Sequence, residues 1–234
     1  MANEAVAELE KALLAEPTFT VHGGSGQEKN RSLCYWGGAV GQDGKIYIVP
    51  RNAAQALCFD PTDKSWKDIG ETFENENQPD GRDKWLAAGV GDDGRIFAMP
   101  STTGRKRDKV LCIDPAKGTA SELGDGVMMD TGGTGNLPFH DTVGPAADGC
   151  FYSIPFDSTN VLVFDPVKGS MKRFGTLDKR NGKWVTGVIC PVDGCIYAFP
   201  WEAERVLRID PVARTAEEIG ETIPKGAHYL GCGV

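Results

Sequence analysis

The stretches DGKIYIVP, at residues 43–50, and LCFDPTDKSWKDIG, at residues 57–70, form the block that decides the fold of this chain. Related blocks begin at Asp93, Asp148 and Asp193, which gives periods of 50, 55 and 45 residues. In every copy Pro follows the first Asp by seven residues, and Gly follows the Asp of Asp-Pro by ten. Such a period is typical of stacked or circular arrays of small units. One repeated domain is therefore expected within the 234 residues.

Each copy predicts four short strands joined by tight turns. Asp-Gly favours a type I′ hairpin, in which both central residues adopt positive φ. The segments that follow, such as 46–49, are apolar on successive residues, so both faces of these strands must be covered. Asp-Pro ends the next strand. The last strand of a copy, such as 67–69 or 217–219, is polar, as is typical of an exposed sheet edge.

Small residues precede each Asp-Gly, at 37–39, 87–89, 142–144 and 186–187. They suit strands that converge on one axis. The order in a unit is then an inner strand, two middle strands and a polar outer strand. The sequence therefore predicts an all-β fold, a β-propeller of four-stranded antiparallel blades. The four full repeats lie at about 33–70, 84–124, 139–175 and 183–220.

The run DGKIYIVP followed by FDPTDKSW, within residues 43–66, resembles the kelch repeat. In that family a strand follows Asp-Gly, and a Trp follows Asp-Pro. The resemblance covers residues 33–220 as four copies and implies a propeller fold. It has two departures, because every copy here has Pro where kelch repeats usually carry a double glycine, and only the first copy keeps the Trp, Trp66. The chain is therefore kelch-like, without assignment to a particular member.

The ends of the chain predict incomplete units. A helical extension at 1–17 is expected before a propeller domain at 18–234. Residues 228–234 resemble 84–90 and predict the inner strand of a further unit. Such ends fit either a fragment of a longer propeller or a four-bladed ring with spare ends. The usual range of four to eight blades favours the fragment.

Composition narrows the class of partner. The net charge of -8 disfavours nucleic acid, whose recognition needs a clustered basic face. No apolar run approaches the roughly 18 residues of a membrane span, and the N-terminus lacks the order of a signal peptide. The seven cysteines form no CxxC pair, so we expect reduced thiols, no bound metal and an intracellular, cytoplasmic setting. No cofactor is expected.

Binding residues are expected on one face of the propeller, the loop face. In this topology the connections between blades and the loops between the two middle strands emerge together, and only these segments vary in length. Variable loops on a rigid scaffold usually carry binding residues. The loop at 201–205 offers Trp201, Glu202 and Arg205, an aromatic side chain with both charges. A role of Trp201 as a cap of the core is equally open.

Two further groups belong to this face. One is a basic run that is either a solvated loop or a docking site for an acidic partner or an anionic ligand. It consists of Arg105, Lys106 and Arg107. The other falls at the starts of inner strands, close to the mouth of the channel; it consists of Lys84, His140, Asp141, Lys183 and His228.

Three functions remain open at this level. The favoured one is a binding module that presents its loop face to a protein or peptide. The second is a small-molecule enzyme of the metal-dependent lactonase or lyase type, because His, Asp and Lys that converge at a channel mouth can hold a metal or transfer protons. With three histidines and no regular acidic pattern, no catalytic motif is found. The third is a structural segment without a site of its own.

Overall fold

The computed structural model describes residues 34–73, 84–101, 109–124 and 137–224, and every structural statement below concerns these ranges. The chain divides into two units, Met1–Ser32 and Leu33–Val234, and the described residues belong to the second. The predicted helical extension at 1–17 and the predicted strand at 228–234 lie outside them.

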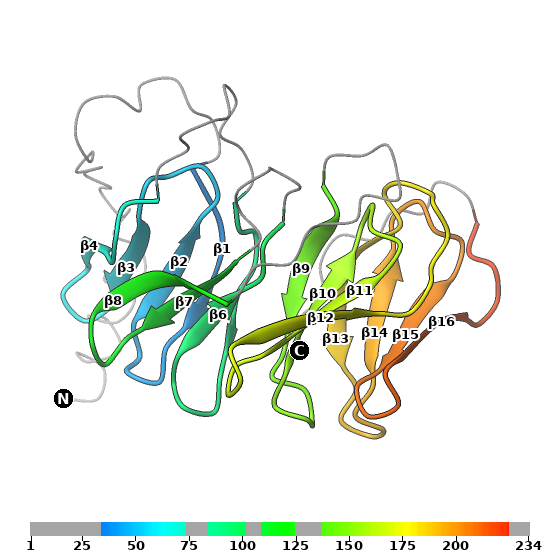
Figure 1. Cartoon of the computed structure of the whole chain (residues 1–234). Coiled ribbons are helices and arrows are strands. Elements are labelled where there is room, and N and C mark those ends of the chain that lie inside the picture. Colours follow the sequence, from blue (N-terminus) through cyan, green and yellow to red (C-terminus); the bar gives the residue numbers. More distant parts are fainter. Residues whose placement is uncertain (1–33, 74–83, 102–108, 125–136, 225–234) are drawn as a thin grey trace, which may run out of the picture. The chain divides into compact units, whose positions relative to one another are not determined.

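The described residues form four antiparallel sheets, each a meander of four strands in chain order (Figure 1). Blade 1 has strands β1 (Tyr35–Val40), β2 (Ile46–Pro50), β3 (Ala56–Asp60) and β4 (Ser65–Ile69). Blade 2 has β5 (Gly89–Val90), β6 (Ile96–Ala98), β7 (Val110–Asp114) and β8 (Thr119–Leu123). Blade 3 has β9 (Phe139–Val143), β10 (Phe151–Pro155), β11 (Val161–Asp165) and β12 (Ser170–Phe174). Blade 4 has β13 (Trp184–Ile189), β14 (Ile196–Pro200), β15 (Val206–Asp210) and β16 (Thr215–Ile219).

The sequence period is also a structural period. The two middle strands pair through equivalent residues in each blade, which are Ile46↔Phe59, Ile96↔Ile113, Phe151↔Phe164 and Ile196↔Ile209. The predicted four-stranded antiparallel units are therefore confirmed. Blade 2 differs in its inner strand, where the ladder is reduced to β5 and a separate bridge between Trp85 and Pro100.

The Asp-Gly hairpins exist, but the predicted type I′ geometry is wrong. Only the glycine has positive φ, as at Gly44 with 77°, and the Asp before it does not. The N–H of Gly44 donates to the carbonyl of Gly41 at 2.9 Å, which is the pattern of a turn that ends in one left-handed residue. The carboxylate of Asp43 accepts the N–H of Lys45 at 3.2 Å. Asp is therefore selected as an acceptor rather than for positive φ.

Consecutive blades share buried apolar clusters, which explains the apolar middle strands. Tyr47 of blade 1 belongs to one cluster with Ile113 of blade 2. Phe97 of blade 2 shares a cluster with Phe164 of blade 3. In contrast, the outer strand β4 is exposed at four of its five residues. The predicted order of strands is confirmed, and the middle strands of blades 2 and 3 are covered on both faces. In blades 1 and 4, one face of the middle strands is only half-buried.

Two observations concern the environment of the chain. No helix of the described ranges has the length and apolar character needed to cross a membrane. The six cysteines in these ranges are free thiols; they are Cys34, Cys58, Cys112, Cys150, Cys190 and Cys195.

Candidate functional site

Trp36 stands at the loop end of the innermost strand of blade 1. The β1–β2 register shifts between Tyr35 and Gly38, and such an irregularity redirects side chains. The Trp36 side chain is 51% exposed. The guanidinium carbon of Arg51, from the loop between β2 and β3, lies 4.6 Å from the centre of its ring. Blade 1 therefore presents a large aromatic surface with a stacked cation.

His140 of β9 connects this tryptophan to blade 3. Its ring centre lies 6.4 Å from that of Trp36, with the rings nearly perpendicular at 87°. On its other side the ring of Phe156 lies at 5.5 Å and 39°. His140 Nδ1 lies 3.1 Å from the carbonyl oxygen of Val185, and because a carbonyl only accepts, Nδ1 carries the proton. This hydrogen bond fixes the plane of the imidazole between the two aromatic neighbours.

Gly182 extends the same set of side chains to blade 4. A Cβ placed on Gly182 would lie 3.6 Å from Phe156 Cζ, 3.5 Å from Trp201 Cδ1 and 3.2 Å from Glu202 Cγ. Phe156 and Trp201 therefore both lie beside this glycine, whose φ of 66° is in the left-handed region. We call Trp36, His140, Phe156 and Trp201 the aromatic row. It joins loop-end residues of blades 1, 3 and 4.

The predicted loop residues at 201–205 fall beside this row. Trp201 is half-buried, and its backbone N–H donates to the carbonyl of Lys183 at 2.7 Å. Glu202 and Arg205 are exposed. The carbonyl of Arg205 accepts the indole N–H of Trp184 at 2.9 Å, which ties the loop to the inner strand. The basic run at 105–107 and His228 lie outside the described residues.

Lys84 and Lys183 are almost completely buried, at 1% and 0% exposure. The ammonium of Lys84 donates to the carbonyl of Ala53, and that of Lys183 donates to the carbonyl of Arg180 at 2.8 Å. Burial lowers the pKa of Lys183 below its ordinary value. In both blades the lysine therefore binds a backbone carbonyl of a loop, which positions that loop on the inner strand.

Asp141 links two inner strands. Its Oδ2 accepts the hydroxyl of Thr186 at 2.8 Å and the N–H of Gly187 at 3.2 Å, and its Oδ1 accepts the N–H of Thr142 at 2.8 Å. Burial raises the pKa of Asp141 despite these hydrogen bonds, which by themselves would lower it. The carboxylate is thus engaged by donors of β9 and β13, and this connection holds the neighbouring His140 in place.

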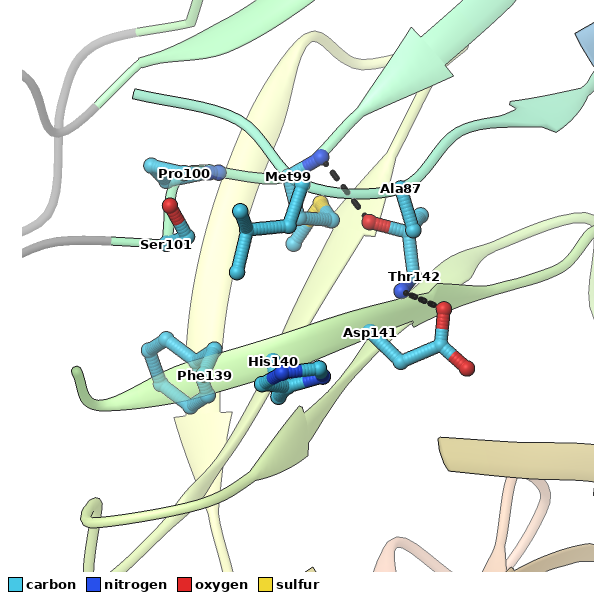
Figure 2. A pocket seen from close by; sticks show the side chains of 9 residues that line it. Ala87, Met99, Pro100, Ser101, Phe139, His140, Asp141 and Thr142 are labelled. Atoms are coloured by element: carbon cyan, nitrogen blue, oxygen red, sulfur yellow. Dashed lines mark hydrogen bonds between the residues drawn. The ribbon is translucent and has the colours of Figure 1, made fainter. Parts of the chain in front are cut away.

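A small pocket opens next to His140 and Asp141 (Figure 2). Blade 2 contributes Met99, whose N–H donates to Thr142 Oγ1 at 3.1 Å, and Ser101. The hollow is shallow, and its interior has no room for a water-sized sphere. Preformed sites for small molecules usually measure about 300–1,000 Å³. This hollow is therefore far too small to enclose a small-molecule substrate, and it is a shallow feature of the surface beside His140 and Asp141.

The sequence singled out His140, Asp141 and Trp201, and the structure brings His140 and Trp201 into one row. It did not single out Trp36, Phe156 or Arg51. Arg51 and Phe156 nevertheless lie in loops between two middle strands, at 50–56 and 155–160. The sequence predicts such loops to form the loop face, so this prediction was the available signal for both residues. Trp36 was hidden because its position in the repeat is occupied by Leu86 in blade 2 and Val185 in blade 4.

In ranges 34–73, 84–101, 109–124 and 137–224, no group of three or more His, Cys, Asp or Glu residues is arranged to hold an ion. The candidate site consists of aromatic rings, arginines and the small pocket.

Four antiparallel four-stranded sheets, with buried apolar clusters between consecutive sheets, define a β-propeller-type protein, and solved structures agree. Virginiamycin B lyase from Staphylococcus aureus matches 85% of this chain and 58% of its own, with a TM-score of 0.59 and 16% identity. A streptogramin B lyase matches 79% of this chain and 54% of its own, with a TM-score of 0.57 and 14% identity. Kuenenia stuttgartiensis hydrazine synthase matches 88% and 53%, with a TM-score of 0.61 and 14% identity.

These likenesses establish the propeller-type fold, because identities of 14–16% carry no more than the fold. The chain spans between 53% and 58% of the length of these three structures. No family model matches the sequence, and no curated protein matches it.

Proposed function

We propose that this chain is a kelch-like β-propeller binding module whose aromatic row receives a segment of a protein or a peptide. The observation that carries the proposal is Trp36, half-exposed beside His140 and stacked under Arg51. Exposed Trp and Arg side chains in a well-packed setting are the residue types that dominate binding energy at protein interfaces.

The chemistry of the row indicates the chemistry of its partner. The aromatic rings favour an apolar or aromatic side chain that packs against them. Arg51 stacks on Trp36, and Arg205 is exposed in the loop that begins with Trp201, so both arginines favour a carboxylate nearby. A partner segment with an apolar anchor next to Asp or Glu therefore fits this surface best.

Other features are consistent with a protein or peptide partner inside the cell. The net charge of -8 supports a protein partner over nucleic acid. Free thiols in blades 1 to 4 support a reducing compartment. The proposal requires no cofactor, and it assigns Lys84, Lys183 and Asp141 to the positioning of loops and of His140.

The proposal is tested with a displayed library of random peptides selected on residues 1–234. Peptides with an aromatic or large apolar residue beside Asp or Glu should be enriched. The Trp36→Ala protein should lose at least about tenfold in affinity for them, since interface tryptophans are frequent hot spots. Trp201→Ala and Arg205→Ala should also weaken binding. Selection of no peptide, or equal binding by the Trp36→Ala protein, would reject the aromatic row as the site.

A further inference from the structure

The face of blade 1 that has no described neighbouring blade contains residues that are buried everywhere else. The positions of Phe59 in blades 2 to 4 are Ile113, Phe164 and Ile209, each with 0% exposure. Those three side chains belong to the clusters shared with the preceding blade. Phe59 itself is half-buried and stacks on Trp66, which is 41% exposed. We call the blade 1 surface formed by Ile46, Leu57, Phe59 and Trp66 the first face.

Blade 4 has the complementary surface. The positions of Tyr197 in blades 1 to 3 are Tyr47, Phe97 and Tyr152, each at most 2% exposed in a cluster shared with the following blade. Tyr197 is only half-buried, and the same holds for Phe199 and Val206. We call the surface formed by Tyr197, Phe199 and Val206 the last face. Tyr197, Phe199 and Val206 keep the residue types that pack against a following blade, whereas the neighbouring Arg208, opposite Tyr197, stands where blades 1 to 3 have Cys58, Cys112 and Val163. Arg208 is held within blade 4 by Asp210 and Glu217.

The glycines that follow the outer strands also show how one blade packs against the next. A Cβ placed on Gly70 would lie 2.4 Å from Ala120 Cβ, and one on Gly175 would lie 3.1 Å from Ala216 Cβ. In both cases the glycine contacts the second residue of the next outer strand. Gly220 of blade 4 has no described atom within 4 Å of such a Cβ. The residue equivalent to Ala120 and Ala216 on the first face is Trp66.

The first face and the last face carry opposite charges at the repeat positions that form an ion pair between blades 3 and 4. At the contact of blades 3 and 4, Arg214 donates to Asp148 at 2.7 Å and also to the hydroxyl of Tyr152. Arg214 has a φ of 56°, and its equivalent in blade 1, the exposed Lys64, has the same conformation with 58°. The last face carries the equivalent acceptor pair, in which the hydroxyl of Tyr197 donates to Asp193 at 2.7 Å.

We propose that the last face of one copy of this chain docks on the first face of a second copy, and that two copies close a ring of eight blades. Lys64 then binds the Asp193 and Tyr197 pair of the other copy, and Trp66 packs over its Gly220. Head-to-tail contacts of this kind close when the rotation per unit is right, and eight blades is within the range of known propellers. The contact uses blade faces and leaves the aromatic row accessible.

The first test is sedimentation equilibrium of residues 1–234. A chain of 25.1 kDa should give a particle of twice that mass at micromolar concentration. A monomer at every concentration would overturn the proposal, whatever else covers the two faces. A zero-length carbodiimide cross-link between Lys64 and Asp193 of different copies, found by mass spectrometry of mixed isotope-labelled protein, is expected in addition.

Variants separate the head-to-tail contact from other dimers. Trp66→Glu on the first face and Phe199→Asp on the last face should each give a folded monomer. An equimolar mixture of the two should recover a dimer, because one contact in that pair is intact. Val167→Glu is the matched control, since Val167 is 93% exposed and lies on neither face. This variant should remain dimeric.

Two results would contradict the geometry. One is a Trp66→Glu protein that still dimerises, and the other is a mixture that stays monomeric while both variants are folded by circular dichroism. If Trp66→Glu or Phe199→Asp unfolds the chain, Lys64→Glu provides an alternative test of the same contact. It lies at an exposed turn, and it should weaken the dimer by about tenfold or more. Unchanged dimerisation of a folded Lys64→Glu protein would remove the charged contact from the proposal.

Discussion

At the scale of single residues, the residues with positive φ show which backbone conformation each turn requires. The Asp-Pro turns end in a residue with positive φ, which is Gly118 in blade 2 and Gly169 in blade 3. Blades 1 and 4 place Lys64 and Arg214 there instead, although an L-residue in this conformation costs about 1–2 kcal/mol. Arg214 offsets this cost through its bonds to blade 3. Lys64 has the same conformation without a blade before it among the described residues.

The first prediction concerns the Asp-Gly turn. Gly44 has a φ of 77°, and no described atom lies within 4 Å of an added Cβ, so a substitution there is opposed by backbone strain alone. Gly44→Val should lower the free energy of unfolding by about 2 kcal/mol, and Gly44→Ala by about 1 kcal/mol. Urea denaturation measures both, with Gln42→Ala in the same turn as the control. A Gly44→Val protein as stable as the parent would show that the turn geometry is wrong.

The second prediction uses the buried ammonium of Lys183. Its pKa is lowered by burial, so above that pKa the unfolded chain binds more protons than the folded chain, up to about pH 10.5. The stability of the parent relative to Lys183→Met should therefore rise as the pH increases through this interval. Denaturation between pH 7 and 10.5 provides the measurement.

Lys168 is the control, because it is exposed and its pKa is raised by Asp165. Its contribution is complete below pH 10.5 and disappears only as the pH rises through the raised pKa. Lys168→Met should thus show a constant difference from the parent over the same interval. A constant difference for Lys183→Met as well would argue against a buried, charged Lys183.

At the scale of elements, the hairpins depend on ionised aspartates. The pKa of Asp60 is lowered to about 2, first by the hydrogen bond from Lys45 and then by the N–H of Thr62. The hydroxyl of Tyr197 and the N–H of Cys195 lower the pKa of Asp193 to about 2 as well. Both aspartates lie in the turns that define the repeat.

The third prediction follows from the sign of these shifts. A lowered pKa contributes stability that is complete above the unfolded value near 4 and is lost as the pH falls toward 2. The parent should therefore exceed Asp60→Asn in stability at pH 5, and the two should converge at pH 2. Urea midpoints at the two pH values give the result. A difference that is the same at pH 5 and pH 2 would contradict the assigned role of Asp60.

The strands could be predicted from the sequence because each block contains turn-forming pairs at fixed spacing, such as Asp43-Gly and Asp60-Pro. The turn type could not, because Asp-Gly suits several turns and the hydrogen bonds of the chain select one. For the site, sequence reasoning indicated the loop face and Trp201. It could not indicate the contact of Trp36 with His140, since this contact joins strands of blades 1 and 3 that are about a hundred residues apart.

At the scale of the whole molecule, two surfaces with different chemistry serve different contacts. The contacts between consecutive described blades are made by apolar residues at equivalent positions of the repeat. The aromatic row lies at loop ends and breaks the repeat, because Trp36, His140 and Phe156 have no aromatic equivalents in blade 2. Contacts that build the propeller therefore follow the common pattern, while the proposed binding site uses the residues that depart from it.

The most direct measurement of the central claim is isothermal titration of one selected peptide against the parent, Trp36→Ala and Trp66→Ala. Both tryptophans belong to blade 1 and are about half exposed, at 51% and 41%, but only Trp36 is in the aromatic row. We predict that Trp36→Ala raises the dissociation constant at least about tenfold, while Trp66→Ala leaves it unchanged even if it weakens the dimer. Equal affinity of the parent and Trp36→Ala would contradict a binding site at the aromatic row.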